Sequence, residues 1–326
     1  MILLIKEKIK LQMLGVDTLK IAVLYGGVSK ERDVSISSSK GIIEALKANN
    51  HEVIGIDFHP DRLHEIIELK VDLVFIGLHG KFGEDGCIQG LLDMLNIPYV
   101  GSGVMASSVA MDKFKAKQLF QSENIPTAKG ERYRITDQTN INDLVEKIHS
   151  SFELPFVVKP NREGSTLGLT IVNNKEQTEQ AIRKAVQSDE FILVEEFIKG
   201  KELTVPVMGK MNEEAALPII EIIPKNVLYD YESKYVQGGS EHIIPARISE
   251  ELTAKIKQYA VMAHQVLGCE IYSRADFLLT DDNIPYILEV NTLPGMTPTS
   301  LFPDSARTNN ISYNEMIETL VQLTVN

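Results

Sequence analysis

Two carboxylates, an arginine and a carboxamide near the C-terminus are spaced so that a β-hairpin would bring them to one face. They are Arg274, Asp276, Glu289 and Asn291, and two runs of strand-forming residues around a polar turn carry them. Side chains of a strand alternate between its faces with period two. Such oxygen ligands suit Mg²⁺, which proteins hold through one or two carboxylates together with substrate phosphates. An arginine beside them can neutralise a phosphate or a developing oxyanion.

The register of this hairpin decides whether the four side chains meet. A turn centred on the 282/283 peptide sets Asp276 opposite Glu289 and Arg274 opposite Asn291. A hairpin with a merely charged solvent face would fit the same pattern, so other parts of the chain must decide between the two. The opposite face is predicted to carry core residues, namely Phe277, Leu279, Leu288 and Val290.

Strands alternate with helices through the first hundred residues, which predicts a parallel sheet with ligands at the carboxyl ends of its strands. The loops expected at that edge cover 26–35, 57–60 and 77–86. Glu31 in the first loop could hold an ammonium group, and it could equally compensate a helix N-terminus. His79 ends a buried strand inside the glycine-rich third loop, which favours a functional role over a structural one.

A second group of residues is suited to phosphates. A buried strand ends in Lys159 and is followed by the glycine- and hydroxyl-rich stretch 161–168, whose backbone N–H groups could close over phosphates; a plain hairpin with a mobile loop is the alternative. Glu202 could accept hydrogen bonds from ribose hydroxyls. A single helix is predicted over 107–123, and it carries three lysines: Lys113, Lys115 and Lys117.

The stretch 226–244 is long, polar and rich in tyrosine and glycine, without a clear period. Long loops in compact domains are often lids over a site. Lys234 and Tyr235 are therefore candidates for substrate contact after closure. A helix over 249–267 is expected directly after it.

Composition limits the class of protein. The chain has 326 residues and a net charge of −12, which argues against nucleic acid as a partner. Only two cysteines occur, so a disulfide framework is excluded and a reducing, cytoplasmic setting is expected. The apolar start of the chain is too short and too charged for a membrane span, and it is interpreted as an accessory extension.

The glycine-containing stretches of the chain match neither a dinucleotide-binding motif nor a P-loop. The G-x-G-x-x-G motif requires a third glycine that is missing after Gly101 and Gly103, and the pair Gly26–Gly27 does not match it. No G-x-x-x-x-G-K-[ST] sequence occurs either. Neither fold has support in this sequence.

With these segments in order, the chain resembles the ATP-grasp enzymes, and closely the D-alanine–D-alanine ligases. The resemblance extends from about residue 19 to near the C-terminus and leaves out the first sixteen residues. It rests on seven specific motifs: GGVSKERDVS, LHGKFGEDG, GSGVMASSVAMDK, VVKPNREGSTLG, YDYESKY, SRADF and LEVNTLPGMTPTSL.

The resemblance implies an α/β (α+β) chain with the ATP-grasp fold, preceded by an N-terminal parallel-sheet domain. It implies a two-step reaction. ATP phosphorylates the carboxylate of one D-alanine, and the amine of a second D-alanine displaces phosphate through a tetrahedral intermediate, giving a dipeptide for peptidoglycan. The expected divisions are an extension at 1–18, a domain for the first D-alanine at 19–102, a central domain at 103–194, and a C-terminal domain at 195–326 with the lid and the metal site.

Roles follow residue by residue from the matching motifs. Glu31 is implied to hold the ammonium of the first substrate, with Ser165 and Tyr235 joining it to the lid. Arg274 and the backbone of Gly295 are implied to stabilise the intermediate. The remaining sets are His79, Ser300 and Leu301 for the substrates; Lys113, Lys159, Glu195, Ile198 and Glu202 for ATP; and Asp276, Glu289 and Asn291 for two Mg²⁺ ions, which Mn²⁺ could replace.

Two departures and two alternatives accompany this assignment. Thr166 replaces a serine and Glu196 replaces a lysine that occur in some members. A D-alanine–D-lactate ligase would share the first half-reaction, but the lid tyrosine is replaced there, so Tyr235 favours the dipeptide. A non-catalytic nucleotide-binding regulator would not need Arg274 and the metal set. D-alanine and ATP are the expected partners, with a cytoplasmic homodimer and neither nucleic acid nor membrane.

Overall fold

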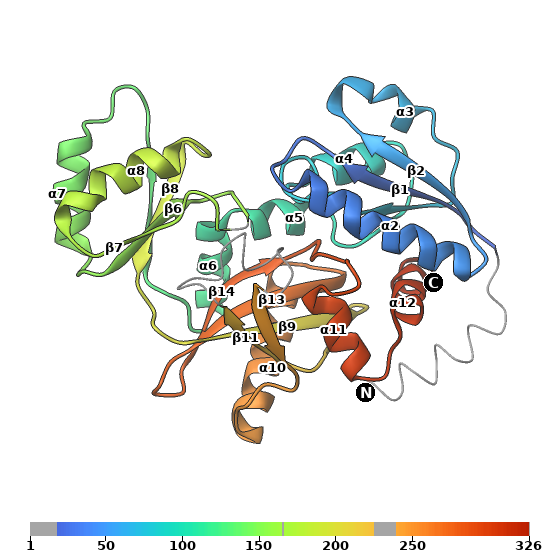
Figure 1. Cartoon of the computed structure of the whole chain (residues 1–326). Helices are drawn as coiled ribbons and strands as arrows, with labels where there is room; N and C mark the ends of the chain where they lie inside the picture. Colours follow the sequence, from blue (N-terminus) through green and yellow to red (C-terminus); the bar gives the residue numbers. More distant parts are fainter. Residues whose placement is uncertain (1–17, 165, 225–238, 326) are drawn as a thin grey trace.

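The computed structural model describes residues 18–164, 166–224 and 239–325, which form three sheets with helices packed on them (Figure 1). This arrangement confirms the α/β expectation. The predicted extension, Ser165, Lys234 and Tyr235 lie outside the described residues. Within these ranges, no helix combines the length and the apolar character that crossing a bilayer would require.

The first sheet is parallel, as predicted, with strand order β2-β1-β3-β4. Its central strand is fully buried from Ile21 to Leu24, as expected for a parallel strand that is covered on both faces. The elements are β1 (Lys20–Gly26), α2 (Arg32–Ala48), β2 (Glu52–Phe58), η2 (Pro60–Arg62), α3 (His64–Ile67), β3 (Leu73–Ile76), α4 (Cys87–Met94) and β4 (Tyr99–Val100).

The last helix of the chain completes the core of this first sheet. Helix α12 (Tyr313–Val325) lies beside α2, although nearly 270 residues separate them in sequence (Figure 1). Met316, Ile317, Leu320 and Val321 are fully buried in the same cluster as the strands β1 and β3. The beginning and the end of the chain therefore share one hydrophobic core.

The second sheet is antiparallel, with order β5-β8-β6-β7, and has a separate core. Figure 1 places it, with its two α-helices, on the far side of α6 from the first sheet. The elements are β5 (Gly130–Arg134), α7 (Ile141–Ser151), β6 (Phe156–Pro160), β7 (Thr170–Val172), η3 (Lys175–Gln177), α8 (Thr178–Val186) and β8 (Phe191–Glu196).

The third sheet lies between the other two in Figure 1 and is antiparallel in all its pairs, with order β12-β11-β9-β13-β14 and β10 added to β9. Its elements are β9 (Lys201–Gly209), β10 (Ala215–Ala216), β11 (Ile220–Pro224), β12 (Ser240–Ile243), α10 (Glu250–Val266), β13 (Ile271–Leu279), β14 (Pro285–Asn291) and α11 (Leu301–Thr308).

The prediction of a single helix over 107–123 is wrong. The chain forms α5 (Val104–Met111) and α6 (Lys113–Ser122) instead, and Asp112 between them has an extended backbone. The Asp112 carboxylate accepts a hydrogen bond from the N–H of Lys115 at 3.0 Å, so it caps the second helix. The break places Lys113 at the start of α6. Both helices pack into the core of the third sheet.

The prediction that the whole stretch 226–244 is an irregular loop is also wrong, because its last residues form a strand. Ser240–Ile243 forms β12 and pairs antiparallel with β11, where His242 lies opposite Ile222. Pairing with β11 gives the backbone groups of these four residues hydrogen-bond partners, which the polar composition did not reveal. The rest of that stretch, up to residue 238, lies outside the described residues.

Candidate active site

The hairpin β13–β14 has the predicted register at the polar residues: Arg274 pairs with Asn291 and Asp276 with Glu289. The turn itself differs from the prediction. Thr280 bonds Ile284 across it, which centres the turn on a single residue. A β-bulge between Asp276 and the next residue restores the predicted register.

The bulge overturns one core prediction. Leu288 is the extra residue on β14, so Ile287, and not Leu288, pairs with Phe277 and is fully buried. Leu288 lines the cavity on the other side of the sheet together with Glu289. An inserted residue reverses the alternation of every side chain beyond it, and periodicity alone does not reveal where it falls. Phe277, Leu279 and Val290 are in the core as predicted.

Asp276 is the centre of a dense polar cluster. Arg274 donates two hydrogen bonds to its carboxylate, from Nε at 2.9 Å and from an Nη at 2.8 Å. Asn291 donates its side-chain N–H to the same carboxylate at 3.0 Å, and Thr204 on β9 donates its hydroxyl at 2.5 Å. The aspartate is therefore oriented from three strands. Thr204 is a partner that the sequence analysis did not single out.

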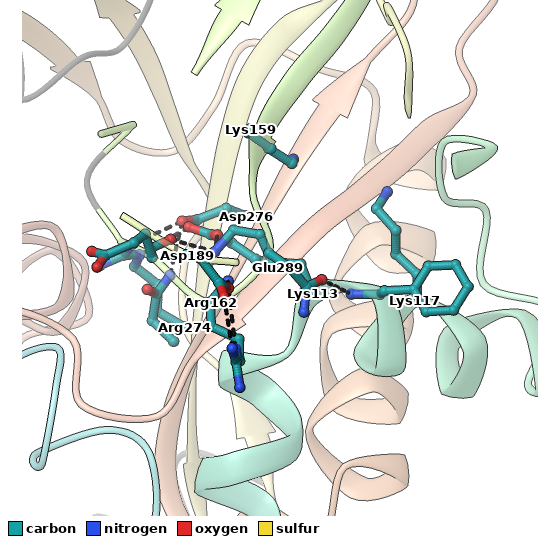
Figure 2. Close-up of polar contacts among 12 residues, drawn as sticks. Lys113, Lys117, Lys159, Arg162, Asp189, Arg274, Asp276 and Glu289 are labelled. Atoms are coloured by element: carbon teal, nitrogen blue, oxygen red, sulfur yellow. Dashed lines mark hydrogen bonds and ion pairs between the residues drawn. The ribbon is translucent and has the colours of Figure 1, made fainter. Parts of the chain in front are cut away.

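Glu289 is joined to the rest of the site by Lys113. The Lys113 ammonium lies 2.9 Å from the Glu289 carboxylate and donates to the backbone carbonyl of Glu163 at 2.7 Å. Figure 2 shows this lysine reaching the hairpin from α6. Burial alone would lower the pKa of Lys113, but the charge and hydrogen bond of Glu289 outweigh it and raise the pKa. The lysine is therefore held charged next to the predicted metal ligands.

The donor set fits Mg²⁺ bound together with a phosphate substrate. Among the described residues, no three His, Cys, Asp or Glu side chains gather closely enough to enclose a metal by themselves. Asp276, Glu289 and Asn291 offer two carboxylates and an amide oxygen from paired positions of one hairpin. Mg²⁺ commonly uses one or two carboxylates and takes its remaining ligands from water and phosphates.

A second charged cluster contains two lysines around one buried carboxylate. Glu195 on β8 pairs with Lys159 on β6, and with Lys117 on α6 at 2.9 Å. All three side chains are at least nine-tenths buried. Burial would raise the pKa of Glu195, but the two ammonium groups lower it to about 2. For Lys117, burial and the charge of Lys159 prevail, so its pKa is lowered despite Glu195.

A cavity of about 540 Å³ lies between the second and third sheets, a size typical of sites for cofactors and drug-sized ligands. One wall is apolar, with Val157, Ile171 and Leu203, and the other end is charged. Seven predicted site residues line it: Lys113, Lys159, Glu195, Ile198, Glu202, Asp276 and Glu289. Glu196, the departure from the family pattern, also lines it, and its carboxylate accepts the N–H of Lys129 at 2.8 Å.

The glycine-rich stretch after Lys159 is fixed at its base and lies over this cavity. Arg162 donates to the Asp189 carboxylate with its guanidinium, at 2.6 and 3.1 Å, and with its backbone N–H at 2.9 Å (Figure 2). Gly164 and Thr166 then line the cavity. The bonds of Arg162 to Asp189 anchor the base of the stretch, and Gly164 near its tip approaches Glu31 in the loop after β1.

Glu31 lies where that tip meets the first sheet. It directly precedes α2 and is 8% exposed. A Cβ on Gly164 would come within 3.1 Å of the Glu31 carboxylate, and one on Gly80 within 3.7 Å, so glycines from two separate loops approach this side chain closely. The neighbouring Arg32 is held by two hydrogen bonds to Asp57, at 2.6 and 2.8 Å.

His79 and Glu84 stand in the loop after β3, close to Glu31. Burial lowers the pKa of His79, although the charge of Glu31 and a bond to the Leu293 backbone oppose this. His79 Nε2 is buried and has no hydrogen-bond partner among the described residues. Burial, together with the charges of Glu31 and Glu289, raises the pKa of Glu84 to about 8 even though the carboxylate accepts the Gly80 N–H at 2.6 Å.

The segment after β14 brings Gly295, Ser300 and Leu301 beside the hairpin. A Cβ on Gly295 would lie 3.2 Å from the Ser300 hydroxyl, which also accepts the Thr297 N–H at 3.0 Å. Ser300 directly precedes α11. The Leu301 side chain is buried against Ile220 and Ile222, so it faces the core of the third sheet.

The contacts join Glu31, Lys113, Glu289 and Asp276 into one series, whereas the side chain of Leu301 faces the core. Ser165 and Tyr235 lie outside the described residues. Three participants were missed. Lys117 stood on the predicted helix over 107–123 and Glu84 in the motif LHGKFGEDG, so their proximity to other charges was the available signal. Thr204 gave no signal, because a threonine in a strand is ordinary.

Comparison with known proteins identifies the family of this chain. The model of the D-ala D-ala ligase C-terminus matches residues 119–322, and that of the D-ala D-ala ligase N-terminus matches residues 60–102. A D-alanine–D-alanine ligase of Halalkalibacterium halodurans is 57% identical over 311 residues, which is 94% of this chain and 99% of that protein.

Two solved structures extend the comparison to the fold. The D-alanine–D-alanine ligase of Bacillus anthracis complexed with ATP superposes with a TM-score of 0.80 at 31% identity, covering 94% of this chain and 98% of that one. The VanG D-Ala:D-Ser ligase of Enterococcus faecalis gives 0.82 at 30% identity, covering 95% and 100%. The expected fold is thereby confirmed. The chain belongs to the D-alanine–D-alanine ligase family.

Proposed function

We propose that this protein joins two D-alanine molecules at the expense of ATP, through an acyl phosphate, and so supplies a dipeptide for peptidoglycan. The observation that carries the proposal is the unbroken series of contacts from Glu31 through the glycine-rich stretch and Lys113 to Glu289 and Asp276. It links a carboxylate suited to an ammonium group with cations and oxygen ligands suited to a triphosphate.

ATP is assigned to the cavity between the second and third sheets. The apolar wall suits a base, and Glu195 and Ile198 are at the adenine end with Glu202 for the ribose. Lys159 and Lys113 would hold phosphates, because both ammonium groups are buried and face the cavity. The Bacillus anthracis relative was solved in complex with ATP, which supports ATP as the nucleotide.

Two Mg²⁺ ions, or Mn²⁺ in their place, would be held by Asp276, Glu289 and Asn291 and would neutralise charge on the phosphates. The protein's own part is positioning, which phosphoryl transfer requires more than covalent help. Lys113 is held at the hairpin by Glu289, and Arg274 by Asp276.

The amino-acid substrates are assigned to the region between Glu31 and the hairpin β13–β14. Glu31 would receive the ammonium of the first D-alanine, with His79 near the reacting carboxylate. Arg274 and the N–H of Gly295 would stabilise the oxyanion of the tetrahedral intermediate, because donors already in place lose little on reaction. Ser300 and Leu301 are assigned to the second D-alanine. The lid, shortened to 226–239 because Ser240–Ile243 is strand β12, completes the proposal with Tyr235 and Ser165 joining it to Glu31, and it would exclude water.

We also propose that the first domain covers 19–102 after an extension at 1–18, the central domain 103–194 and the C-terminal domain 195–326. The enzyme is proposed to act as a homodimer in the cytoplasm. Two thiols without a disulfide, Cys87 and Cys269, agree with a reducing compartment.

The test is phosphate release from ATP across a panel of D-alanine, L-alanine, D-serine and D-lactate, with the dipeptide identified by mass spectrometry. D-alanine alone is expected to support release with one dipeptide formed per phosphate. Release that requires D-lactate or D-serine as second substrate would reassign the second site. Absence of any amino-acid-dependent release would exclude the ligase function.

A further inference from the structure

One residue of the segment after β14 is held at both its backbone groups by helices of the first domain. The N–H of Met296 donates to the Ser38 hydroxyl on α2 at 3.2 Å. The carbonyl of Met296 accepts from the Tyr313 hydroxyl on α12 at 2.6 Å. The two helices that pack on the first sheet thus hold the backbone of a single residue by hydrogen bonds, next to the hairpin of the third sheet.

Both contacts are enclosed by protein. Ser38 is 1% exposed and Met296 is 2% exposed. The Tyr313 ring packs on the first core, and its hydroxyl passes over Gly41, where a Cβ would come within 2.8 Å. Burial raises the pKa of Tyr313, so the hydroxyl keeps its proton and remains a donor. Buried hydrogen bonds of this kind fix a backbone well, because breaking either one leaves an unpaired group.

These two hydrogen bonds lie next to a residue that is proposed to take part in catalysis. Met296 directly follows Gly295, and the turn around Ser300 comes close to Gly295, where a Cβ would lie 3.2 Å from the Ser300 hydroxyl. Helix α2 begins directly after Glu31. The same helix therefore sets the position of the carboxylate at one end of the site and of the Gly295 backbone at the other.

We propose that Ser38 and Tyr313 are positioning residues for the ligation step, which hold Met296 so that the preceding Gly295 N–H is aimed at the oxyanion of the tetrahedral intermediate. This inference rests on the proposed ligase function. Neither side chain is expected to touch a substrate. They act through the backbone of one residue, and they bind the first domain and the hairpin into a single frame.

The test uses two substitutions that remove one oxygen atom each, Tyr313→Phe and Ser38→Ala. Ser39→Ala is a matched control, because Ser39 is the next residue on α2, is 1% exposed, and its hydroxyl has no partner among the described residues. Tyr133→Phe is the control for the phenol, since its hydroxyl bonds Glu131 in the second sheet at 2.7 Å. Each variant is assayed at saturating ATP with D-alanine varied, and for inhibition by a phosphinate analogue of the dipeptide, which imitates the tetrahedral intermediate.

A displaced oxyanion donor should reduce kcat about tenfold in Tyr313→Phe and Ser38→Ala, and weaken phosphinate binding by a similar factor, since transition-state mimics report such contacts. The KM values for ATP and for the first D-alanine should stay within about twofold, because uniform substrate binding is not touched. Both control variants should behave like the wild type. The double variant should lose little more than either single one if the two hydroxyls hold one residue.

The inference is overturned if folded Tyr313→Phe keeps kcat and phosphinate affinity within twofold of the wild type, even when its Tm falls. That result would show that the hydrogen bonds of Ser38 and Tyr313 to Met296 contribute only to stability. It is also overturned if KM rises while kcat is unchanged. Should Ser38→Ala fail to fold, Tyr313→Phe decides alone, because it keeps the packed ring. A wild-type protein that makes no dipeptide would instead refute the proposed function itself.

Discussion

The Lys113 ammonium lies 2.9 Å from the Glu289 carboxylate, and this ion pair joins the first turn of α6 to the hairpin of the third sheet. Both groups are predicted to contact ATP, the lysine through a phosphate and the glutamate through metal. The pair therefore keeps the two ligands of the nucleotide together before the nucleotide binds.

Substitution Glu289→Gln should reduce turnover by at least about 100-fold, because an amide is a far weaker ligand for Mg²⁺ than a carboxylate. The free energy of unfolding should change by less than about 2 kcal/mol, because Lys113 keeps its bond to the Glu163 carbonyl. Initial rates and urea unfolding measure the two effects. Exposed Glu176→Gln is the control, and an active Glu289→Gln enzyme would remove this residue from the metal site.

Substitutions of Glu31 and of Arg274 should affect different kinetic constants. Glu31→Gln is expected mainly to raise the KM of the first D-alanine, because it removes a charge from substrate binding. Arg274→Ala is expected to lower kcat by roughly 100-fold, as for other preorganised oxyanion donors. Arg274→Lys serves as the control that keeps the charge and loses the paired hydrogen bonds. If Arg274→Ala changed only the first KM, the assignment of these two residues would be wrong.

Glu84 should make the ligand-free protein less stable as pH rises. Its folded pKa of about 8 lies above the ordinary 4.5, so the native carboxyl keeps a proton that the unfolded chain releases. The stability is present below pH 4.5 and is lost between 4.5 and 8. Glu84→Gln should therefore gain roughly 2–4 kcal/mol over the wild type at high pH and almost nothing at low pH.

Urea unfolding in EDTA at several pH values between 4.5 and 8.5 would measure this difference for Glu84. A gap between variant and wild type that stays constant with pH would show that the raised pKa is not present in the folded protein. The gap should shrink on addition of Mg²⁺ and ATP, because cations near Glu289 offset the repulsion between carboxylates.

Glu221 predicts the opposite trend at acid pH. The hydrogen bond from Arg247, aided by Lys201, lowers its pKa to about 2 despite burial. A depressed folded pKa gives stability that is present above the ordinary 4.5 and is lost as pH falls toward 2. Glu221→Gln should cost roughly 2 kcal/mol at pH 7. The difference should shrink progressively as pH falls from 4.5 toward 2, and a cost that stays constant over this range would mean that lost packing, not charge, is responsible.

Much of this site could be predicted from the sequence because its residues are organised by local patterns. Period-two alternation on the hairpin was enough to bring Asp276 and Glu289 together. Alternating strands and helices were enough to place Glu31 and His79 at the same edge of a parallel sheet. These inferences need only neighbours along the chain.

The errors arose where a single residue changed the pattern. Because of the bulge, Leu288 faces the cavity and not the core as predicted. An N-cap at Asp112 divides the predicted single helix into two. Composition also hid β12, since a polar edge strand looks like a loop until its partner β11 is known.

The long-range contacts could not be predicted at all. The hydrogen bonds of Met296 to Ser38 and Tyr313 join three parts of the chain that no local rule connects. The same is true of the buried pair His51 and Glu318, 2.9 Å apart, which ties α12 to the first sheet. Such contacts follow from the packing of α12 against α2, and only the three-dimensional structure contains that information.

The most direct test of the account is the fate of the carboxylate oxygens of D-alanine. In the proposed reaction a carboxylate oxygen of the first D-alanine attacks the terminal phosphorus of ATP, and it leaves with phosphate when the second amine forms the peptide bond. D-alanine labelled with ¹⁸O in its carboxylate should therefore give phosphate that contains one ¹⁸O for each dipeptide formed. Dipeptide formation with unlabelled phosphate would contradict an acyl phosphate and, with it, the mechanism derived for this site.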